Sequence, residues 1–346
     1  MAFNKISFEE SLGKNVVAAE RCIGCGTCIL VCPYNCLEYR EGIPVIVKEC
    51  KVCGICARAC PQNEWSQSEV EKAVFNREKQ PSEEFGVYRK LVIARAKDEA
   101  VQKVAQDGGA VTALLTFGLK SGIFDGAIAS GKSRDKPLYP APMLATSLSE
   151  ILEGAGTRYT YSPNILALAE AVKQKKHSLA FVGTPCQIRA VRKLQMAGLK
   201  RYTAPIKLSI GLMCSESFTY EGLIEGYIRG KLGINPEEIS KMNIKGKMLV
   251  TTKSGVKAIP LAEVKPYVRK GCGYCQDFSS ELADISAGGL GLDGWTFIII
   301  RTETGEKIFE SAEKAGFLET RSPDEKEPAM NLLLKLSSKK RKAPAA

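Results

Sequence analysis

The chain has 346 residues, of which 45% are hydrophobic and 25% charged, a composition ordinary for a globular protein with two domains or slightly more. It contains no run of about 18 apolar residues and no N-terminal secretion signal, so we expect neither a transmembrane helix nor export. Its thirteen cysteines are spaced as thiolate ligands rather than as a secreted disulfide framework, which favours the cytoplasm.

The net charge of +11 comes from the later part of the chain. Residues 1–80 hold ten basic and ten acidic residues, so the remaining 39 of the 49 basic and 28 of the 38 acidic residues supply the excess. Four basic residues lie in the C-terminal stretch 336–346, which we expect to be a disordered tail: Lys339, Lys340, Arg341 and Lys342. No basic helix or aromatic platform favours nucleic acid, which we do not expect as a partner. An anionic small ligand or an acidic partner explains the excess as well.

Two cysteine runs dominate residues 1–65. They read C-I-G-C-G-T-C-I-L-V-C-P at 22–33 and C-K-V-C-G-I-C-A-R-A-C-P at 50–61. Each is C-x2-C-x2-C-x3-C-P, the run that binds [4Fe–4S] clusters, in which the fourth cysteine ligates the other cluster. The predicted ligand sets are therefore crossed: Cys22, Cys25, Cys28 and Cys60 for one cluster, and Cys50, Cys53, Cys56 and Cys32 for the other. A zinc site would show two C-x2-C pairs instead.

Residues 1–65 are thus expected to form a bacterial-type ferredoxin domain with two [4Fe–4S] clusters. Cys36 falls outside the pattern and is interpreted as a small buried residue. Gly42 and Pro44 mark a turn between two short strands. The polar stretch 66–87 predicts a surface helix followed by a linker, with the domain boundary there.

Strands and helices alternate after residue 88, which predicts a mixed α/β domain over 88–335. We expect strands at 91–96, 123–129, 177–183 and 206–214, helices at 97–106, 110–120 and 220–231 and from Pro185 onward, and a hairpin at 248–260. The stretch 296–307 is expected to be a strand that leads into a glycine turn.

Four further cysteines form a second constellation: Cys186, Cys214, Cys272 and Cys275. One C-x2-C pair and two distant cysteines could form a third cluster or a zinc site. Alternatively, Cys186 and Cys214 are small buried residues and only the pair is reactive. The spacing alone leaves both interpretations open.

Glycine-rich turns recur in the α/β domain, at 107–109, 154–157, 183–185 and 288–291. Turns of this kind at helix starts can present N–H groups to phosphates, although each alone is more often simple loop chemistry. None is G-x-G-x-x-G after a strand, so a Rossmann dinucleotide site is not supported. His177, the only histidine, is expected to have a surface or capping role, and we predict no catalytic side chain.

Five segments in this domain resemble the family of beta subunits of coenzyme F420 hydrogenases and dehydrogenases, over about residues 87–318. They read Q-D-G-G-A-V-T-A-L-L (106–115), G-A-G-T-R-Y-T-Y-S-P (154–163), F-V-G-T-P-C-Q-I-R-A (181–190), G-L-M-C-S-E-S-F (211–218) and K-G-C-G-Y-C-Q-D-F-S-S-E-L-A-D-I-S-A-G-G-L-G (270–291). Several independent motifs in the same order make the resemblance specific.

The resemblance implies one FAD, a face that binds the deazaflavin coenzyme F420, and a [4Fe–4S] cluster held by Cys186, Cys214, Cys272 and Cys275. It suggests that FAD is lined by Gly108, Gly109, Thr157, Arg158, Tyr159, Gly183, Thr184 and Pro185, with Asp284, Ile285, Ser286 and Gly288 nearby. One departure is Gly289, where relatives often carry a polar residue, which puts flavin contact there in doubt.

The activity implied is hydride transfer between coenzyme F420 and FAD, in either direction, with single electrons passing through the clusters to a partner. The partner would be a complex of the membrane F420H2 dehydrogenase or soluble heterodisulfide reductase type, so the chain would be cytoplasmic or peripheral at the inner face of the membrane. Two alternatives are an electron-transfer subunit without its own substrate and a chlorophyll-derivative reductase of the same family. The two-cluster domain argues against the latter.

Overall fold

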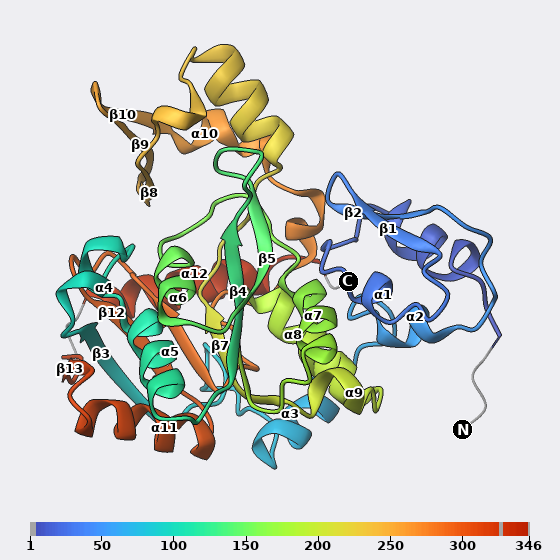
Figure 1. Cartoon of the computed structure of the whole chain (residues 1–346), viewed down its shortest axis with the longest axis horizontal. Helices are drawn as coiled ribbons and strands as arrows, with labels where there is room; N and C mark the ends of the chain where they lie inside the picture. Colours follow the sequence, from blue (N-terminus) through green and yellow to red (C-terminus); the bar gives the residue numbers. More distant parts are fainter. Residues whose placement is uncertain (1–4, 325–327, 345–346) are drawn as a thin grey trace.

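The structure, a computed structural model, describes residues 5–324 and 328–344. Figure 1 shows an N-terminal domain in blue beside a large α/β body, from which a smaller subdomain in gold projects. None of the helices in the described part of the chain has the length and apolar character needed to cross a bilayer.

The N-terminal domain is built from short elements around the cysteine runs. They are η1 (Glu9–Val17), α1 (Thr27–Leu30), β1 (Leu37–Arg40), β2 (Ile43–Ile46) and α2 (Ile55–Ala59), followed by α3 (Gln67–Phe75). Gly26 and Gly54 precede α1 and α2 with φ of 82° and 70°, a left-handed conformation that glycine adopts readily within each run. The predicted two-stranded hairpin and the helix after residue 66 are confirmed.

The body contains one sheet of eight strands, and its predicted mixed character is confirmed. Its order is β13-β3-β12-β11-β7-β6-β4-β5, with bounds β3 (Lys90–Ala96), β4 (Gly126–Lys132), β5 (Pro140–Ala145), β6 (Leu179–Gly183), β7 (Ile206–Leu212), β11 (Ile285–Gly288), β12 (Thr296–Ile300) and β13 (Leu318–Arg321). Strands β4, β6, β7 and β11 are parallel. Strand β3 runs in the same direction, because β12 is antiparallel to both β3 and β11. The carboxyl ends of these five strands therefore share one edge.

Helices cover both faces of the sheet (Figure 1). One face carries α4 (Glu99–Val104), α5 (Ala110–Lys120), α6 (Leu148–Glu153) and α11 (Glu303–Lys314). The other carries η2 (Asn164–Leu166), α7 (Ala167–Lys173), α8 (Pro185–Met196), α9 (Lys200–Thr203) and α12 (Pro328–Arg341). The N-terminal domain packs on this second face, because its apolar residues share one core with Ile188 and Leu194 of α8 and Leu168 of α7.

A subdomain is inserted between β7 and β11. It comprises η3 (Glu221–Lys231), η4 (Pro236–Glu238), β8 (Lys241–Lys245), β9 (Lys247–Thr252), β10 (Gly255–Pro260), α10 (Leu261–Val264) and η5 (Lys265–Tyr267), and η6 (Lys270–Tyr274) leads back to the body. Its own core includes Leu223, Tyr227, Met248 and Val250. The predicted helix at 220–231 and the hairpin at 248–260 are confirmed, whereas β8 was not anticipated.

The prediction of a glycine turn at the end of the stretch 296–307 is wrong, because the chain enters helix α11 there. Thr302 caps this helix, since its hydroxyl oxygen accepts a hydrogen bond from the Gly305 backbone N–H at 3.1 Å. Gly305 lies in the first turn, where a Cβ would come within 2.5 Å of the Asp284 carbonyl oxygen. The glycine therefore serves close packing rather than a change of chain direction.

The expectation of a disordered tail over 336–346 is also wrong for its described part, because residues up to Arg341 belong to α12. Ala329 and Leu333, four residues apart, are buried in one apolar cluster with strands of the sheet, so the helix is held by an apolar stripe. The basic residues at its end form specific contacts. Arg341 pairs with Glu281 at 2.8 Å. Residues 345–346 lie outside the described residues.

A test of this docking is Leu333→Ala, which removes a side chain that is fully buried against Ile93, Phe297 and Ile299. We expect a loss of about 2–5 kcal/mol in the free energy of unfolding, measured as a lower urea midpoint under anaerobic conditions. The exposed Lys335→Ala in the same helix is the control and should change little. Equal midpoints for the two variants would contradict the packing of α12.

A buried charge network holds the linker, the β11 region and α12 together. Arg301 is 1% exposed and donates to Ser286 Oγ (2.7 Å), the Val87 carbonyl (2.8 Å) and Ser279. Glu281, beside it, pairs with Arg341 and with Lys79. Burial, and then repulsion from Asp277, raises the pKa of the Glu281 carboxyl to about 7.

This network predicts a pH dependence of stability. Glu281 titrates near 4.3 in the unfolded chain, so between about pH 4.3 and 7 the folded state binds more protons and its stability falls as pH rises. We therefore compare the urea midpoints of the wild type and Glu281→Gln at two pH values. The midpoint of the wild type minus that of the variant should be larger at pH 5.5 than at pH 7.5. An identical slope in both proteins would contradict the assignment.

Candidate functional site

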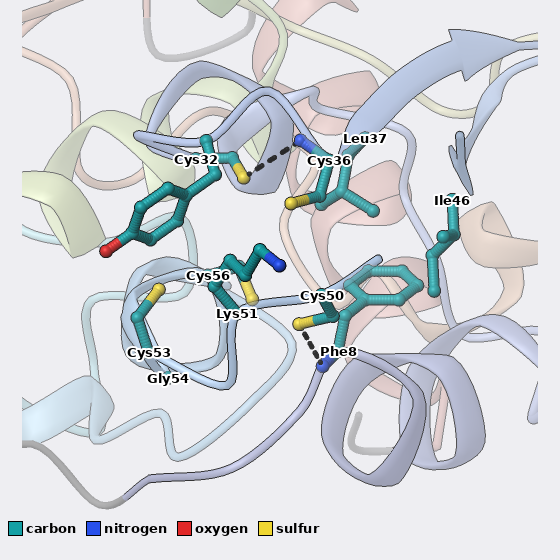
Figure 2. Close-up of a pocket in the computed structure, with 11 residues that line it drawn as sticks. Phe8, Cys32, Cys36, Leu37, Ile46, Cys50, Lys51, Cys53, Gly54 and Cys56 are labelled. Carbon is teal, nitrogen blue, oxygen red and sulfur yellow. Dashed lines mark hydrogen bonds between the residues drawn. The ribbon is translucent and has the colours of Figure 1, made fainter. Parts of the chain in front are cut away.

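One cysteine site lies at the outer end of the N-terminal domain. Its pocket is lined by Cys50, Cys53 and Cys56 of the second run and by Cys32 of the first (Figure 2). The backbone N–H of Phe8 donates to Cys50 Sγ at 3.4 Å, and that of Cys36 donates to Cys32 Sγ at 3.3 Å. The structure thus brings together the four cysteines of one predicted crossed set. We call this group the outer site.

Cys36 lines the same pocket but differs from the four. It is 4% exposed, and its thiol donates to the Glu49 carbonyl at 3.2 Å. Its predicted burial is confirmed, and that it is not a ligand stays a prediction.

The other crossed set, Cys22, Cys25, Cys28 and Cys60, forms what we call the inner site. Cys28 faces the other three closely enough that, after burial, their charges raise the pKa of its thiol. Burial raises the pKa of the Cys25 thiol to about 12. Free thiolates would therefore not form here at neutral pH, and a bound metal group is what stabilises such deprotonated cysteines.

The four remaining cysteines also gather, in a group that we call the third site. Cys186 lies in the first turn of α8, Cys214 follows β7, and Cys272 and Cys275 lie at η6, and all four line one pocket. Thr184 Oγ1 lies 3.2 Å from Cys186 Sγ, and the Ser217 N–H donates to Cys272 Sγ at 3.4 Å. This convergence disfavours the interpretation of isolated buried cysteines.

Two cations accompany the third site and were missed by the sequence analysis. Arg269 and Lys340 line its pocket, and Lys340 Nζ donates to the Cys272 carbonyl at 3.1 Å. Burial raises the pKa of Cys275 to about 11, and the Lys340 ammonium opposes that shift. The run R-K-G-C, which ends at Cys272, could have indicated that Arg269 lies near the site. Nothing in the sequence connects Lys340 with a site so much earlier in the chain.

Each of the three groups supplies four cysteine sulfurs. In the described residues, no three His, Cys, Asp or Glu side chains are arranged to hold one metal ion. A zinc ion would draw its thiolates to about 2.3 Å from one centre, whereas a cuboidal cluster places an iron between each thiolate and the centre. The donor sets, four cysteines each, fit [4Fe–4S] clusters at all three places.

Most of the predicted flavin residues meet at the carboxyl edge of the sheet. The Thr157 N–H donates to Gln106 Oε1 at 3.4 Å, which joins the 154–159 loop to the 107–109 turn. Thr184 lies at the same edge, at the start of α8 after β6. Gly289 follows β11 there, and a Cβ on it would lie 2.3 Å from Asp107 Oδ2, so a larger residue would displace the Asp107 carboxylate.

Other predicted flavin residues have structural roles. Asp284 and Ile285 lie at the opposite, amino end of β11, where Asp284 accepts hydrogen bonds from Ser209 and Thr302. Ser286 Oγ accepts from Arg301. The Arg158 guanidinium donates to backbone carbonyls at the end of α6, those of residues 153–156. Asp284 and Ser286 are therefore engaged within the sheet, and the Arg158 guanidinium is bound to the backbone of its own loop.

Gly108 is likewise explained by packing, because a Cβ would lie 2.7 Å from backbone atoms of Ala94, Trp295 and Thr296. His177 is exposed, and its backbone N–H donates to Asp125 at 2.7 Å, so its predicted surface role is confirmed.

Known proteins match this arrangement. Residues 91–169 match the model for the N-terminal part of the coenzyme F420 hydrogenase/dehydrogenase beta subunit, and residues 176–326 match the model for its C terminus. Residues 16–38 match a 4Fe-4S binding domain.

Individual relatives extend over most of the chain. The beta subunit of the coenzyme F420 hydrogenase of Methanothermobacter thermautotrophicus is 42% identical over 74% of this chain and 92% of its own length. A subunit of the F(420)H(2) dehydrogenase of Methanosarcina mazei is 36% identical over 74% of this chain and 71% of its own. A chain in the F420-reducing [NiFe] hydrogenase complex from Methanosarcina barkeri superposes with a TM-score of 0.72 at 36% identity, covering 77% of this chain and 92% of that one.

Together, the ferredoxin-type [4Fe–4S] domain and the mixed α/β body define an iron–sulfur oxidoreductase. The chain belongs to the family of coenzyme F420 hydrogenase/dehydrogenase beta subunits.

The crossed ligand sets predict the outcome of single substitutions. Cys32→Ser and Cys50→Ser come from different runs but should weaken the same cluster, with a loss of about four irons per chain in each case. Cys36→Ser, in the same pocket, should retain the full iron content. Iron and sulfide analysis with EPR of the reduced proteins measures this. Loss of different EPR signals in Cys32→Ser and Cys50→Ser would contradict the crossed sets.

Proposed function

We propose that the chain is the electron-input subunit of an F420-linked redox complex. In this proposal it oxidises reduced coenzyme F420 by hydride transfer to FAD at the carboxyl edge. It then passes single electrons through three [4Fe–4S] clusters to a partner of the F420H2 dehydrogenase or heterodisulfide reductase type. The same parts support the reverse direction.

The observation that carries the proposal is the succession of the three cysteine sites. Ile23 of the first cysteine run lines the pocket of the third site, and a Cβ on Gly271 would lie 2.3 Å from the Cys22 carbonyl oxygen. The third site therefore adjoins the inner site. Cys32 and Cys60, the crossed cysteines, connect the inner site to the outer site.

The two ends of the row of cysteine sites suit the entry and the exit of electrons. At the entry end, Thr184 and Cys186 lie at the carboxyl edge, together with the predicted flavin turns. At the exit end, the outer site lies beside Tyr34 and Val52, whose exposed fractions are 52% and 40%. Apolar side chains exposed next to a redox site suit contact with a partner subunit.

Residues at the carboxyl edge fit a flavin dinucleotide. Gly109 stands at the N-terminus of α5, whose N–H groups favour phosphate oxygens. Thr184 begins α8, where a capping box already binds the Thr184 N–H to Gln187 Oε1. Gly108, Thr157, Tyr159, Gly183, Pro185 and Gly288 complete the proposed lining. FAD supplies both hydride acceptance and one-electron release, so no side-chain acid or base is required. The residues of the edge would orient the two ring systems and exclude water.

The proposal is tested by anaerobic titration of the FAD-reconstituted protein with reduced coenzyme F420, followed by absorbance. Flavin and iron–sulfur bands should bleach together as oxidised coenzyme forms. If they stay oxidised while dithionite still reduces the clusters, the chain is a relay or acts on another substrate, and the proposal fails.

Removal of one ligand of the third site should uncouple the two half-reactions. In Cys186→Ala, reduction of the flavin by the coenzyme should survive, because the edge remains intact. Electron delivery to a one-electron acceptor should fall to the level of the cluster-free protein. Stopped-flow absorbance measures both steps, with Cys36→Ala as the control. Undiminished delivery in Cys186→Ala would remove the third site from the path.

A further inference from the structure

Arg269 lies between the third site and the inner site, and Arg189 of α8 is a second buried arginine near ligands of both. Arg269 is 9% exposed, and its backbone N–H donates to the Ser217 carbonyl at 2.9 Å. Its guanidinium carbon lies 4.2 Å from the centre of the Tyr161 ring, and the Tyr161 hydroxyl lies 3.7 Å from Cys186 Sγ. On this side, the guanidinium is one aromatic ring away from a ligand of the third site.

The same guanidinium reaches into the ferredoxin-type domain. Arg269 Nη2 donates to the Gly42 carbonyl at 2.8 Å, in the turn between β1 and β2. A Cβ on Gly24 would lie 2.1 Å from Nη2 and 2.3 Å from the Gly42 carbonyl oxygen, and its φ is +62°, so only glycine fits at this position. The N–H of this same Gly24 donates to Cys22 Sγ at 3.4 Å. On this side, the Arg269 guanidinium packs against Gly24, whose N–H donates to a ligand of the inner site.

The positive charge of Arg269 has no carboxylate partner among residues 5–324 and 328–344, where its polar contacts are carbonyls and an aromatic face. A buried cation is costly unless an anion compensates it. Burial lowers the pKa of Arg269, but the nearby tyrosines and cysteines outweigh burial and hold it above its usual value. The anionic groups in reach are the cysteine ligands of the two sites, including Cys22, Cys186 and Cys272.

We propose that Arg269 is a buried charge that compensates both clusters at the junction and couples their reduction. A cluster held by four thiolates is anionic and gains one negative charge on reduction, and net charge is one determinant of its potential. A fixed cation between two such clusters favours the reduced form of each. Arg269 therefore acts as a positioning residue. It raises both reduction potentials and holds the Gly42 turn against the third site. This proposal rests on the proposed function, because it requires clusters at both sites.

The test is Arg269→Met in the full-length protein, with reduction potentials measured by EPR-monitored titration with dithionite and mediators. Signals are assigned by comparison with Cys32→Ser and Cys186→Ala. At a fixed potential, the ratio of reduced to oxidised cluster should fall at least tenfold for the third and inner sites, which corresponds to about 59 mV for a one-electron couple. The outer site, remote from Arg269, is the internal reference and should not shift.

Two other cations provide matched controls. Lys270, the next residue, pairs with Glu20 across the same junction, but its side chain is 71% exposed and screened by water. Lys270→Met should shift no potential. Lys340 contacts the third site alone, at the Cys272 carbonyl. Lys340→Met should lower the third potential and leave the inner one unchanged.

The outcomes separate the two proposals. Fewer than three clusters in the wild type would overturn the proposed function and this inference with it. Three clusters with unchanged potentials in Arg269→Met would overturn the inference alone. If Arg269→Met does not retain its clusters, Arg269→Lys tests whether the charge or the shape of the side chain is required. It keeps the charge and should retain the clusters at potentials close to the wild type. The same cluster loss in Arg269→Lys would show that shape rather than charge is required, and would overturn the inference.

Discussion

The arrangement of the three cysteine sites depends on the contact between the first cysteine run and the segment that carries Cys272. Gly271 packs against the Cys22 carbonyl, and Arg269 packs over Gly24 and binds Gly42. This contact sets two cysteine sites from distant parts of the sequence beside each other. Without it, the ferredoxin-type domain would be attached by its linker and by its packing on η2, α7, α8 and α9. The proposed path from the carboxyl edge to the outer site would then be broken.

The chemistry of buried sulfur explains much of the surrounding structure. Burial raises the pKa values of most of the cysteines, so their ligand form requires metal, backbone N–H donors and nearby cations. The N–H groups of Phe8, Gly24, Cys36 and Ser217 supply donors. Lys340 supplies a cation from the end of the chain, which gives the docking of α12 a functional consequence. The C-terminal helix, through Lys340, lines the pocket of the third site and is not a disordered tail.

The sequence was most informative where spacing is local. The two cysteine runs, the strand at 91–96 and the helix from Pro185 follow directly from short patterns, and the structure has them. It was least informative where contacts are distant. The charge run at 339–342 resembles a solvated tail, and only the apolar spacing of Ala329 and Leu333 indicates a helix. Asp284 and Ser286 belong to a motif shared with relatives, yet their hydrogen bonds show that they support β11.

The most direct test of the central claim is the order in which the clusters are reduced. Wild-type protein would be mixed with reduced coenzyme F420 and frozen at successive times for EPR. We predict that the signal of the third site appears first, that of the inner site next and that of the outer site last, because the path runs from the carboxyl edge outward. An outer-site signal that precedes the third-site signal would contradict the account.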